Sequence, residues 1–260
     1  MQFVVLGPVE LVTDRRVAPA GSKERRLLSV LLINADAVVP RHRLVDELWE
    51  GAPPSTAVNL VHQYVARLRR KLHDADPDRT GPDPTTGRLV TRGHGYLLRV
   101  RPGELDATRF DSMLARAQDA MITRQPLCAA TILGQALDLW RGPAFADVAP
   151  TATIAAATRR LEERRLTALE LRADADLLLG RHANLVGELT ELVAHHPLRE
   201  RLRAQLMLAL YRSDRQADAL AVYQIGRRLL AETLGLEPGA RLQRLERDIL
   251  RREPYLDHTV

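Results

Sequence analysis

The segment from residue 55 to residue 72 constrains the fold more than any other part of this chain, because its two faces differ sharply in chemistry. Apolar side chains recur at the spacing of a helix that turns about 100° per residue, which predicts one core-facing stripe. That stripe consists of Val61, Val65, Leu68 and Leu72. The opposite face carries Asn59, Gln63, Ala66, Arg67 and Arg70. A helix of this kind needs other elements to cover its apolar side and leaves amide and guanidinium groups exposed.

The polar face has the composition of a DNA-reading surface. Arginine can bond guanine through two N–H groups, asparagine or glutamine can bond adenine in the same way, and a small alanine permits close approach. The candidates for major-groove contacts are Asn59, Gln63, Arg67 and Arg70. The candidates for phosphate contacts are Lys23, Arg41, Arg43, Tyr64, Arg69 and Lys71. For the helix taken alone, a basic face that is merely solvated remains an equal alternative.

A glycine-turned hairpin follows this helix. Residues 89–98 alternate as strand, turn and strand, and a hairpin directly after a basic helix is the layout of a winged helix. Arg92 and His94 fall at the predicted wing tip, where arginine can enter a narrow minor groove. A segment rich in Pro, Gly and Asp, residues 74–87, separates helix and wing and leaves the position of the wing open.

The elements before residue 55 complete a small α+β domain. Residues 2–6, 9–12 and 16–18 are predicted to form an antiparallel sheet. Ser22 is the expected N-cap of a helix that ends near residue 35, with Leu27, Leu28, Leu31 and Leu32 inside. Pro40 opens another helix that ends at Gly51. Its expected inner face is Leu44, Val45, Leu48 and Trp49.

Net charge separates the chain at Pro102-Gly103, the expected domain boundary. Residues 1–103 hold 16 Lys and Arg against 11 Asp and Glu, a net charge of +5, whereas residues 104–260 hold 22 of each kind. A basic excess confined to one domain favours a polyanionic partner, with nucleic acid ahead of membrane. We therefore expect residues 1–103 to bind DNA and residues 104–260 not to.

From residue 104 onward the apolar spacing is helical. Predicted helices begin near Phe110 and cover residues 129–140, 154–179 (one helix or a pair), 185–193, 198–211, 217–234 and 242–250. A shift of 34 residues aligns this region with itself. The shift pairs Ala173 with Met207, Gly180 with Asp214, Arg181 with Arg215, Ala183 with Ala217 and Leu189 with Tyr223. This period is typical of tetratricopeptide repeats, so we predict two stacked helical pairs, with a third possible around residues 114–140, and a surface suited to protein partners.

The sequence offers little for an enzyme. It has no phosphate loop of P-loop spacing, and His195-His196 lies at a predicted helix end without other ligands nearby, so we expect no cofactor and no metal. The acidic residues Glu162, Glu163, Asp174 and Asp176 lie among arginines and are interpreted as solvated ion pairs. The single cysteine, Cys128, is expected to be a buried structural thiol, and Trp49 and Trp140 are expected to fill cores. Without a signal peptide or an apolar run of about 20 residues, the expected location is cytoplasmic, with no membrane partner.

Several segments carry a family resemblance. The N-terminal region, residues 1–101, resembles the OmpR-type winged helix through Leu44-Val45-Asp46-Glu47-Leu48-Trp49, Val65-Ala66-Arg67-Leu68-Arg69-Arg70-Lys71-Leu72 and Thr91-Arg92-Gly93-His94-Gly95-Tyr96. Residues 105–110, 136–143, 196–202 and 223–239 resemble the bacterial transcriptional activation domain. Together, residues 1 to about 252 look like a small member of the Streptomyces antibiotic regulatory protein family.

The resemblance implies a fold that is mainly α, an OmpR-type winged helix at 1–103 followed by a tetratricopeptide-like helical domain at 104–260. It implies an activator of a secondary-metabolite gene cluster that binds direct repeats near the −35 promoter element and recruits RNA polymerase holoenzyme, through its principal sigma factor and other subunits, with a second protomer on the DNA. No receiver domain precedes the winged helix, so phosphoacceptor control within the chain is not expected. The alternative is a repeat scaffold whose winged helix binds protein rather than DNA.

Overall fold

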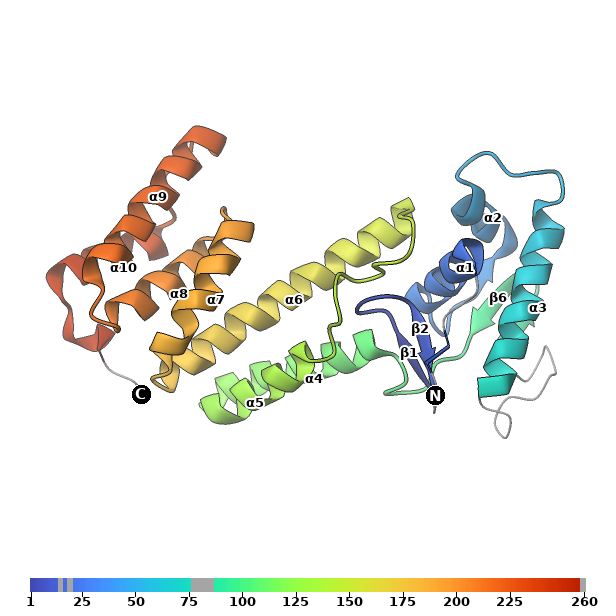
Figure 1. Ribbon diagram of the computed structural model, residues 1–260, viewed down its shortest axis with the longest axis horizontal. Helices are drawn as coiled ribbons and strands as arrows, with labels where there is room; N and C mark the ends of the chain where they lie inside the picture. Colours follow the sequence, from blue (N-terminus) through green and yellow to red (C-terminus); the bar gives the residue numbers. More distant parts are fainter. Residues whose placement is uncertain (14–15, 18–20, 76–86, 258–260) are drawn as a thin grey trace. The chain divides into compact units, whose positions relative to one another are not determined.

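The computed structural model describes residues 1–13, 16–17, 21–75 and 87–257 (Figure 1). These residues form two compact units, one made of residues 1–113 with 136–165 and the other of 114–135 with the chain from 166 onward. The division falls inside the helices α4 (Asp106–Ile122), α5 (Pro126–Leu137) and α6 (Ala152–Leu178). Among the described residues, no helix has the length and apolarity needed to cross a membrane.

The first unit opens with the predicted antiparallel sheet. Its strands are β1 (Gln2–Val4), β2 (Glu10–Val12) and β3 (Arg16–Val17), in the order β1-β2-β3. β1 is shorter than predicted because the backbone N–H groups of Val5 and Leu6 donate to the Asp106 carboxylate, at 2.9 and 3.0 Å, and not to a neighbouring strand. The carboxylate at the start of α4 thereby anchors the end of β1.

Three helices and a short strand follow the sheet: α1 (Ser22–Ile33), β4 (Val39–Pro40), α2 (Arg41–Trp49) and α3 (Ala57–Ala75). The core stripe of α3 is confirmed, since Val61, Val65, Leu68 and Leu72 are all buried. The predicted N-cap of α1 is wrong: Gly21 occupies that position with extended backbone, and Ser22 is the first helical residue. Strand β4 has no strong sequence signal because it is two residues long and includes a proline.

The hairpin after α3 is confirmed as β5 (Leu89–Arg92) and β6 (Gly95–Leu98). Arg92 pairs with Gly95, which leaves Gly93 and His94 as a two-residue turn. β6 also pairs with β4, so the second sheet has the order β4-β6-β5. Most of the segment expected to lengthen the link between helix and wing, residues 76–86, lies outside the described residues.

The remaining chain is helical, as predicted. After α6 come α7 (His182–His195), α8 (Glu200–Tyr211), α9 (Gln216–Leu234), α10 (Ala240–Arg251) and the 3-10 helix η1 (Pro254–Leu256). Residues 152–178 form one helix, which settles the alternative left open above. Trp140 lies beyond the end of α5 and not within it, yet it is buried against Phe110, with ring centroids 5.4 Å apart.

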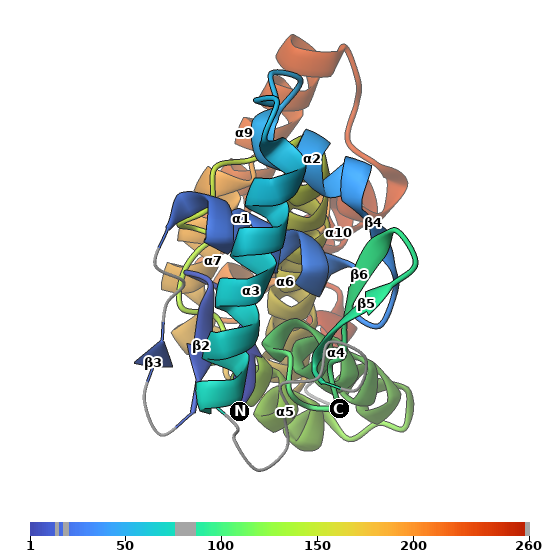
Figure 2. The ribbon, with the colours of Figure 1, turned by 90° about the vertical axis from the view of Figure 1, so that its right-hand side faces the viewer.

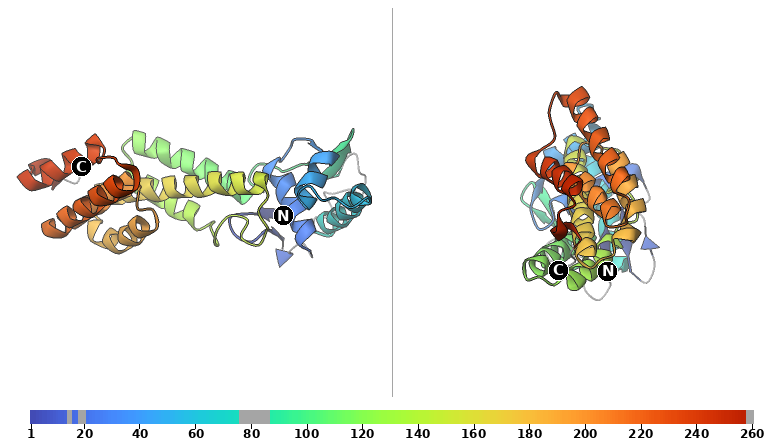
Figure 3. Two further views of the ribbon diagram at one scale, coloured as in Figure 1. Left: turned by 90° about the horizontal axis from the view of Figure 1, so that it is seen from above. Right: turned by 90° about the vertical axis from the view of Figure 1, so that its left-hand side faces the viewer.

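The 34-residue repeat has a structural counterpart in the second unit. Gly180 and Asp214 both adopt positive φ, 75° and 59°, at the turns before α7 and α9, and Arg181 and Arg215 are the N-cap residues of those helices. Leu189 and Tyr223 both lie in one hydrophobic cluster. Figure 3 shows the helices of this unit, coloured orange to red, packed against one another. The stacked helical pairs predicted from the period are therefore present.

Of the other interpretations made from the sequence, some are confirmed by the structure and one is wrong. His195 ends α7 and hydrogen bonds the Glu191 carbonyl at 2.8 Å, as expected of a helix-end residue. Glu162, Asp174 and Asp176 form ion pairs with Arg165, Arg201 and Arg181. The prediction of a buried thiol is wrong, because Cys128 lies exposed in the first turn of α5.

Candidate nucleic-acid interface

The exposed face of α3 holds the four predicted base-reading residues. Asn59, Gln63, Arg67 and Arg70 are all exposed, opposite the buried stripe, and Ala66 lies among them. In Figure 2, α3 faces the viewer along its length with the β5–β6 hairpin beside it. Within the described part of the chain, the side chains of Asn59, Gln63 and Arg70 have no polar partner. They are therefore available to base edges.

Arg92 and His94 stand exposed at the tip of the wing. The tight turn requires glycine at two positions. Gly93 has φ of 53°, and a Cβ on Gly95 would lie 2.5 Å from the Val39 carbonyl oxygen in β4. The close approach of β4 and β6 thus fixes the base of the wing and leaves its tip exposed.

Arg69 joins α3 to the wing. Its guanidinium donates to the Leu89 carbonyl and to the Thr91 hydroxyl, both at 2.8 Å, and lies 5.9 Å from the Tyr96 ring centroid. Burial lowers the pKa of Arg69 and raises the pKa of the Tyr96 hydroxyl. The predicted phosphate contact of Arg69 stays a prediction, and its observed contacts are those of a residue that holds the hairpin against the helix.

A second basic group gathers at the start of α2. The Arg41 guanidinium lies 3.4 Å from His62 Nε2 of α3 and 3.4 Å from His94 Nδ1 of the wing, and the Arg41 backbone N–H donates to the His94 carbonyl at 2.9 Å. The His62 ring also meets Tyr96 edge-on. Arg43, two residues further along α2, is exposed and has no polar partner among the described residues. Arg41 therefore lies on the side of the domain that the wing and α3 share.

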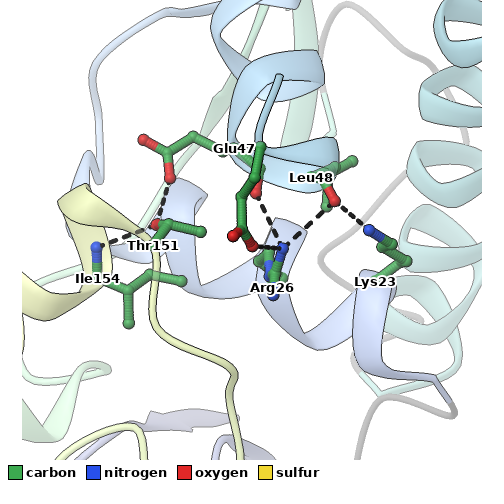
Figure 4. Close-up of polar contacts among 7 residues, drawn as sticks. Lys23, Arg26, Glu47, Leu48, Thr151 and Ile154 are labelled. Carbon is green, nitrogen blue, oxygen red and sulfur yellow. Dashed lines mark hydrogen bonds and ion pairs between the residues drawn. The ribbon is translucent and has the colours of Figure 1, made fainter. Parts of the chain in front are cut away.

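The end of α2 is held by side chains from α1 (Figure 4). Lys23 donates to the Leu48 carbonyl and lies over the Trp49 ring, while Arg26 donates to the same carbonyl at 3.3 Å and to Glu50 at 2.6 Å. Burial lowers the pKa of Lys23. These cations meet the carbonyl end of the helix, where positive charge is favoured. Trp49 is half-buried, which fits the predicted core role only in part.

The same helix is tied to α6 on its other side. The Glu47 carboxylate accepts hydrogen bonds from the hydroxyls of Thr151 and Thr153, and the Thr151 hydroxyl accepts the Ile154 N–H at 3.3 Å (Figure 4). Thr151 thus caps α6 while it binds α2. The winged helix and the first turns of α6 consequently belong to one compact unit.

A buried carboxylate lies beneath the reading face. Glu24 of α1 is 5% exposed, and its two oxygens accept hydrogen bonds from Lys71 Nζ at 2.8 Å and from Arg67 Nη1 at 3.4 Å. Burial by itself raises the pKa of Glu24, but the hydrogen bonds and charges of Lys71 and Arg67 outweigh it and hold that pKa below its ordinary value. Arg67 also lies 5.8 Å from the Tyr64 ring centroid, so two neighbours limit its orientation.

Sequence reasoning missed Glu24 and His62 as parts of this site. Glu24 lies in the first turn of α1, and its spacing with Leu28 and Leu31 puts it on the buried face of that helix. His62 lies between two predicted DNA contacts but was not selected, because its neighbours Arg41 and His94 are 21 and 32 residues away. The first had a periodic signal, whereas the second needed the tertiary structure.

The fold and this surface define a class. A helix with an exposed amide and guanidinium face, followed by a hairpin with an exposed arginine at its tip, is the DNA-binding arrangement of a winged helix. It is joined to a stack of helical pairs, which is an architecture of protein interaction. The chain therefore has the architecture of a winged-helix DNA-binding protein with a helical interaction domain.

Comparison with known proteins identifies the family. The family described as "Transcriptional regulatory protein, C terminal" matches residues 16–98, and the family described as "Bacterial transcriptional activator domain" matches residues 105–250. The regulatory protein DnrI of Streptomyces peucetius is 40% identical over 99% of this chain and 94% of its own length. The chain belongs to the Streptomyces antibiotic regulatory protein family, which confirms the resemblance and the fold class expected from the sequence.

Other relatives are longer. The regulatory protein AfsR of Streptomyces coelicolor is 43% identical over 98% of this chain, which spans only 25% of AfsR. The transcriptional regulator RedD of the same species is 39% identical over 98% of the chain and 72% of RedD. The solved structure of Mycobacterium tuberculosis EmbR, in complex with a low-affinity phosphopeptide, matches with a TM-score of 0.91 at 34% identity, covering 97% of this chain and 65% of that one.

Proposed function

We propose that this regulator activates a secondary-metabolite gene cluster by binding direct repeats near the −35 promoter element and recruiting RNA polymerase holoenzyme. In this proposal residues 1–103 bind the DNA, and residues 104–260 contact the principal sigma factor, other polymerase subunits and a second protomer. The activity belongs to the cytoplasm, where the chromosome lies. The relatives DnrI and RedD, named as regulators, support the general role.

The observation that carries the proposal is the exposed polar face of α3. Its groups are the ones that discriminate base pairs in the major groove, and they are exposed beside a wing that carries Arg92. The assignment is that Asn59, Gln63, Arg67 and Arg70 read bases, that Arg92 and His94 enter the minor groove, and that Lys23, Arg41, Arg43, Tyr64, Arg69 and Lys71 contact phosphates. The net charge of +5 in residues 1–103 gives the attraction that all sequences share.

Mutations can separate base recognition from phosphate binding. Arg67→Ala should lower affinity for the selected DNA site by about 1–3 kcal/mol and relax base preference, because it removes a contact to a base edge. Arg43→Ala is the matched control, since Arg43 is an exposed arginine of the same domain and is assigned to phosphate. It should weaken binding to all duplexes alike. Fluorescence anisotropy with a site selected from a randomised pool, and with a scrambled duplex of equal composition, measures both effects.

Equal losses on the selected and scrambled duplexes for Arg67→Ala would contradict the assignment of α3 as the reading helix. Failure of the native chain to retain any duplex at low salt would favour the alternative function, a scaffold whose winged helix binds protein.

The wing makes a separate prediction. Arg92→Ala should reduce affinity about fivefold for a site whose wing-proximal minor groove is AT-rich, because a narrow groove concentrates negative potential around an inserted arginine. The loss should shrink when that stretch is replaced by GC pairs. Binding curves on the two duplexes, with all other bases unchanged, test this. The same loss on both would assign Arg92 to the phosphates and not to the groove.

A further inference from the structure

The buried Glu24 carboxylate faces the reading helix and not the domain core alone. Its partners Arg67 and Lys71 are one turn apart on α3, and the Arg67 side chain is 50% exposed whereas Glu24 is 5% exposed. The carboxylate therefore lies behind Arg67, on the side away from solvent. The contact is made by one terminal nitrogen of the guanidinium, Nη1, so it restricts the orientation of the group from one side.

This geometry bears on how Arg67 would meet a base. A free arginine has about 2 kcal/mol of rotamer entropy, and much of it is lost when the fork docks on guanine. Glu24 at 3.4 Å and the Tyr64 ring at 5.8 Å restrict the side chain before DNA arrives. A side chain ordered in advance gives up less freedom on binding and favours one orientation, which sharpens discrimination between bases.

The carboxylate also affects binding that is independent of sequence. Lys71 Nζ lies 2.8 Å from Glu24, so part of its charge is balanced within the protein. Loss of that carboxylate would leave the full charge of Lys71 to act on phosphates. One residue thus has opposite effects on selected and random DNA.

We propose that Glu24 is a specificity-determining positioning residue, which holds Arg67 toward the bases and restrains the phosphate attraction of Lys71. This inference rests on the proposed base reading by Arg67. Glu24 itself does not touch DNA in this arrangement, and it acts through the two cations above it.

The central experiment uses the full chain with Glu24→Gln, which preserves side-chain shape and removes the charge. Affinity for the scrambled duplex should rise about two- to fivefold, the size of one partly exposed ion pair. The ratio of selected to scrambled affinity should fall at least about fivefold, because the orientation of Arg67 is lost. The slope of log affinity against log salt should steepen by at most about one, as for one additional phosphate contact.

Two further variants separate charge from position. Glu24→Asp keeps the charge but withdraws it from Arg67, so it should lower the ratio without raising scrambled binding. Glu50→Gln is the matched charge control, since Glu50 pairs with Arg26 at the end of α2 and not with α3. It should change affinity for both duplexes alike and leave their ratio unaltered.

A double variant tests the route of the effect. If Glu24 acts through Arg67, Glu24→Gln added to Arg67→Ala should lower the ratio no further than Arg67→Ala does alone. Thermal unfolding of each variant shows whether a substitution has a purely structural effect. If the Glu24→Gln chain does not fold, Glu24→Asp takes its place in these measurements. Such an effect would lower affinity for both duplexes together.

The outcomes distinguish the two hypotheses. If Arg67→Ala leaves the ratio unchanged, base reading by Arg67 fails and the role of Glu24 falls with it. If Arg67→Ala lowers the ratio while Glu24→Gln and Glu24→Asp leave it intact, only the inference on Glu24 is overturned. A lower ratio together with stronger scrambled binding in Glu24→Gln supports it.

Discussion

Replacement of Asp106 by alanine is expected to lower the free energy of unfolding of the first unit by about 2–5 kcal/mol. The Asp106 carboxylate accepts the backbone N–H groups of Val5 and Leu6, both in buried residues, and no strand in the described part of the chain supplies another acceptor. A buried donor left without a partner costs about 1–3 kcal/mol. Two such donors at the end of β1 account for the expected loss.

Tryptophan fluorescence during urea unfolding measures this loss in the intact chain. Trp49 and Trp140, the two tryptophans of the sequence, both lie in the first unit, so the signal reports that unit. Asp46→Ala is the matched control, because Asp46 is an exposed aspartate of the same unit without a side-chain partner among the described residues. It should change stability by less than about 0.5 kcal/mol. A comparably small effect at Asp106 would show that the end of β1 is satisfied in another way.

Protonation provides an independent check on Asp106. Burial raises its pKa above the ordinary value, and this outweighs the backbone N–H groups that favour the charged form. A carboxyl with a raised pKa in the folded state stabilises most below its unfolded pKa and loses that contribution as pH rises through the folded value. The native chain should therefore lose stability relative to Asp106→Asn between those two pKa values as pH rises toward neutral.

Features set by local sequence patterns could be predicted from the sequence, whereas the long-range contact of Asp106 could not. The two faces of α3 follow from the spacing of Val61, Val65 and Leu68, because helical periodicity is local. The 34-residue period, likewise a property of the linear sequence, pairs Gly180 with Asp214, and the structure places both at turns before helices. Pairing of Asp106 with Val5 spans 101 residues, and no local pattern reports such a contact.

The candidate site likewise contains residues that local sequence patterns predict and residues that only the tertiary structure brings together. Arg92 and His94 were located at the wing tip because a glycine turn between strands is a local signal. The contacts of Arg69 with Leu89 and Thr91, and those of Glu24 with α3, depend on how helices and hairpin pack. Cys128 illustrates the converse error. Its apolar neighbours suggested burial, yet it lies in the first turn of α5 beside Leu127, which is also exposed.

The second large effect concerns transcription and not DNA affinity. A chain that ends at Gly180 lacks α7 to α10 but retains every residue of the first unit and the whole of α6. Binding to a single site should stay close to native, since α3 and the wing are intact. Cooperative binding to tandem sites should fall roughly 100-fold, because contacts between neighbouring protomers gain from high effective concentration only while the contact surface exists. Activation of a promoter with purified polymerase holoenzyme should be lost. The truncated and native chains are compared at protein concentrations that give equal occupancy of the DNA sites.

A substitution in the full-length chain can disturb the second unit without deleting any of it. Such a variant is needed because truncation exposes the apolar side chains of Leu166, Ala173 and Leu177. A Cβ on Gly226 in α9 would lie 2.3 Å from Nε of the buried Arg203, whose guanidinium donates to the Pro197 carbonyl at 2.9 Å and to the Val222 carbonyl at 3.0 Å. Gly226→Ala should therefore loosen the helical stack and lower activation and cooperativity together, while single-site affinity and tryptophan fluorescence stay native. Full activation by the chain that ends at Gly180 would contradict a role for α7 to α10 in recruitment, because residues 1–180 would then hold every surface that polymerase needs.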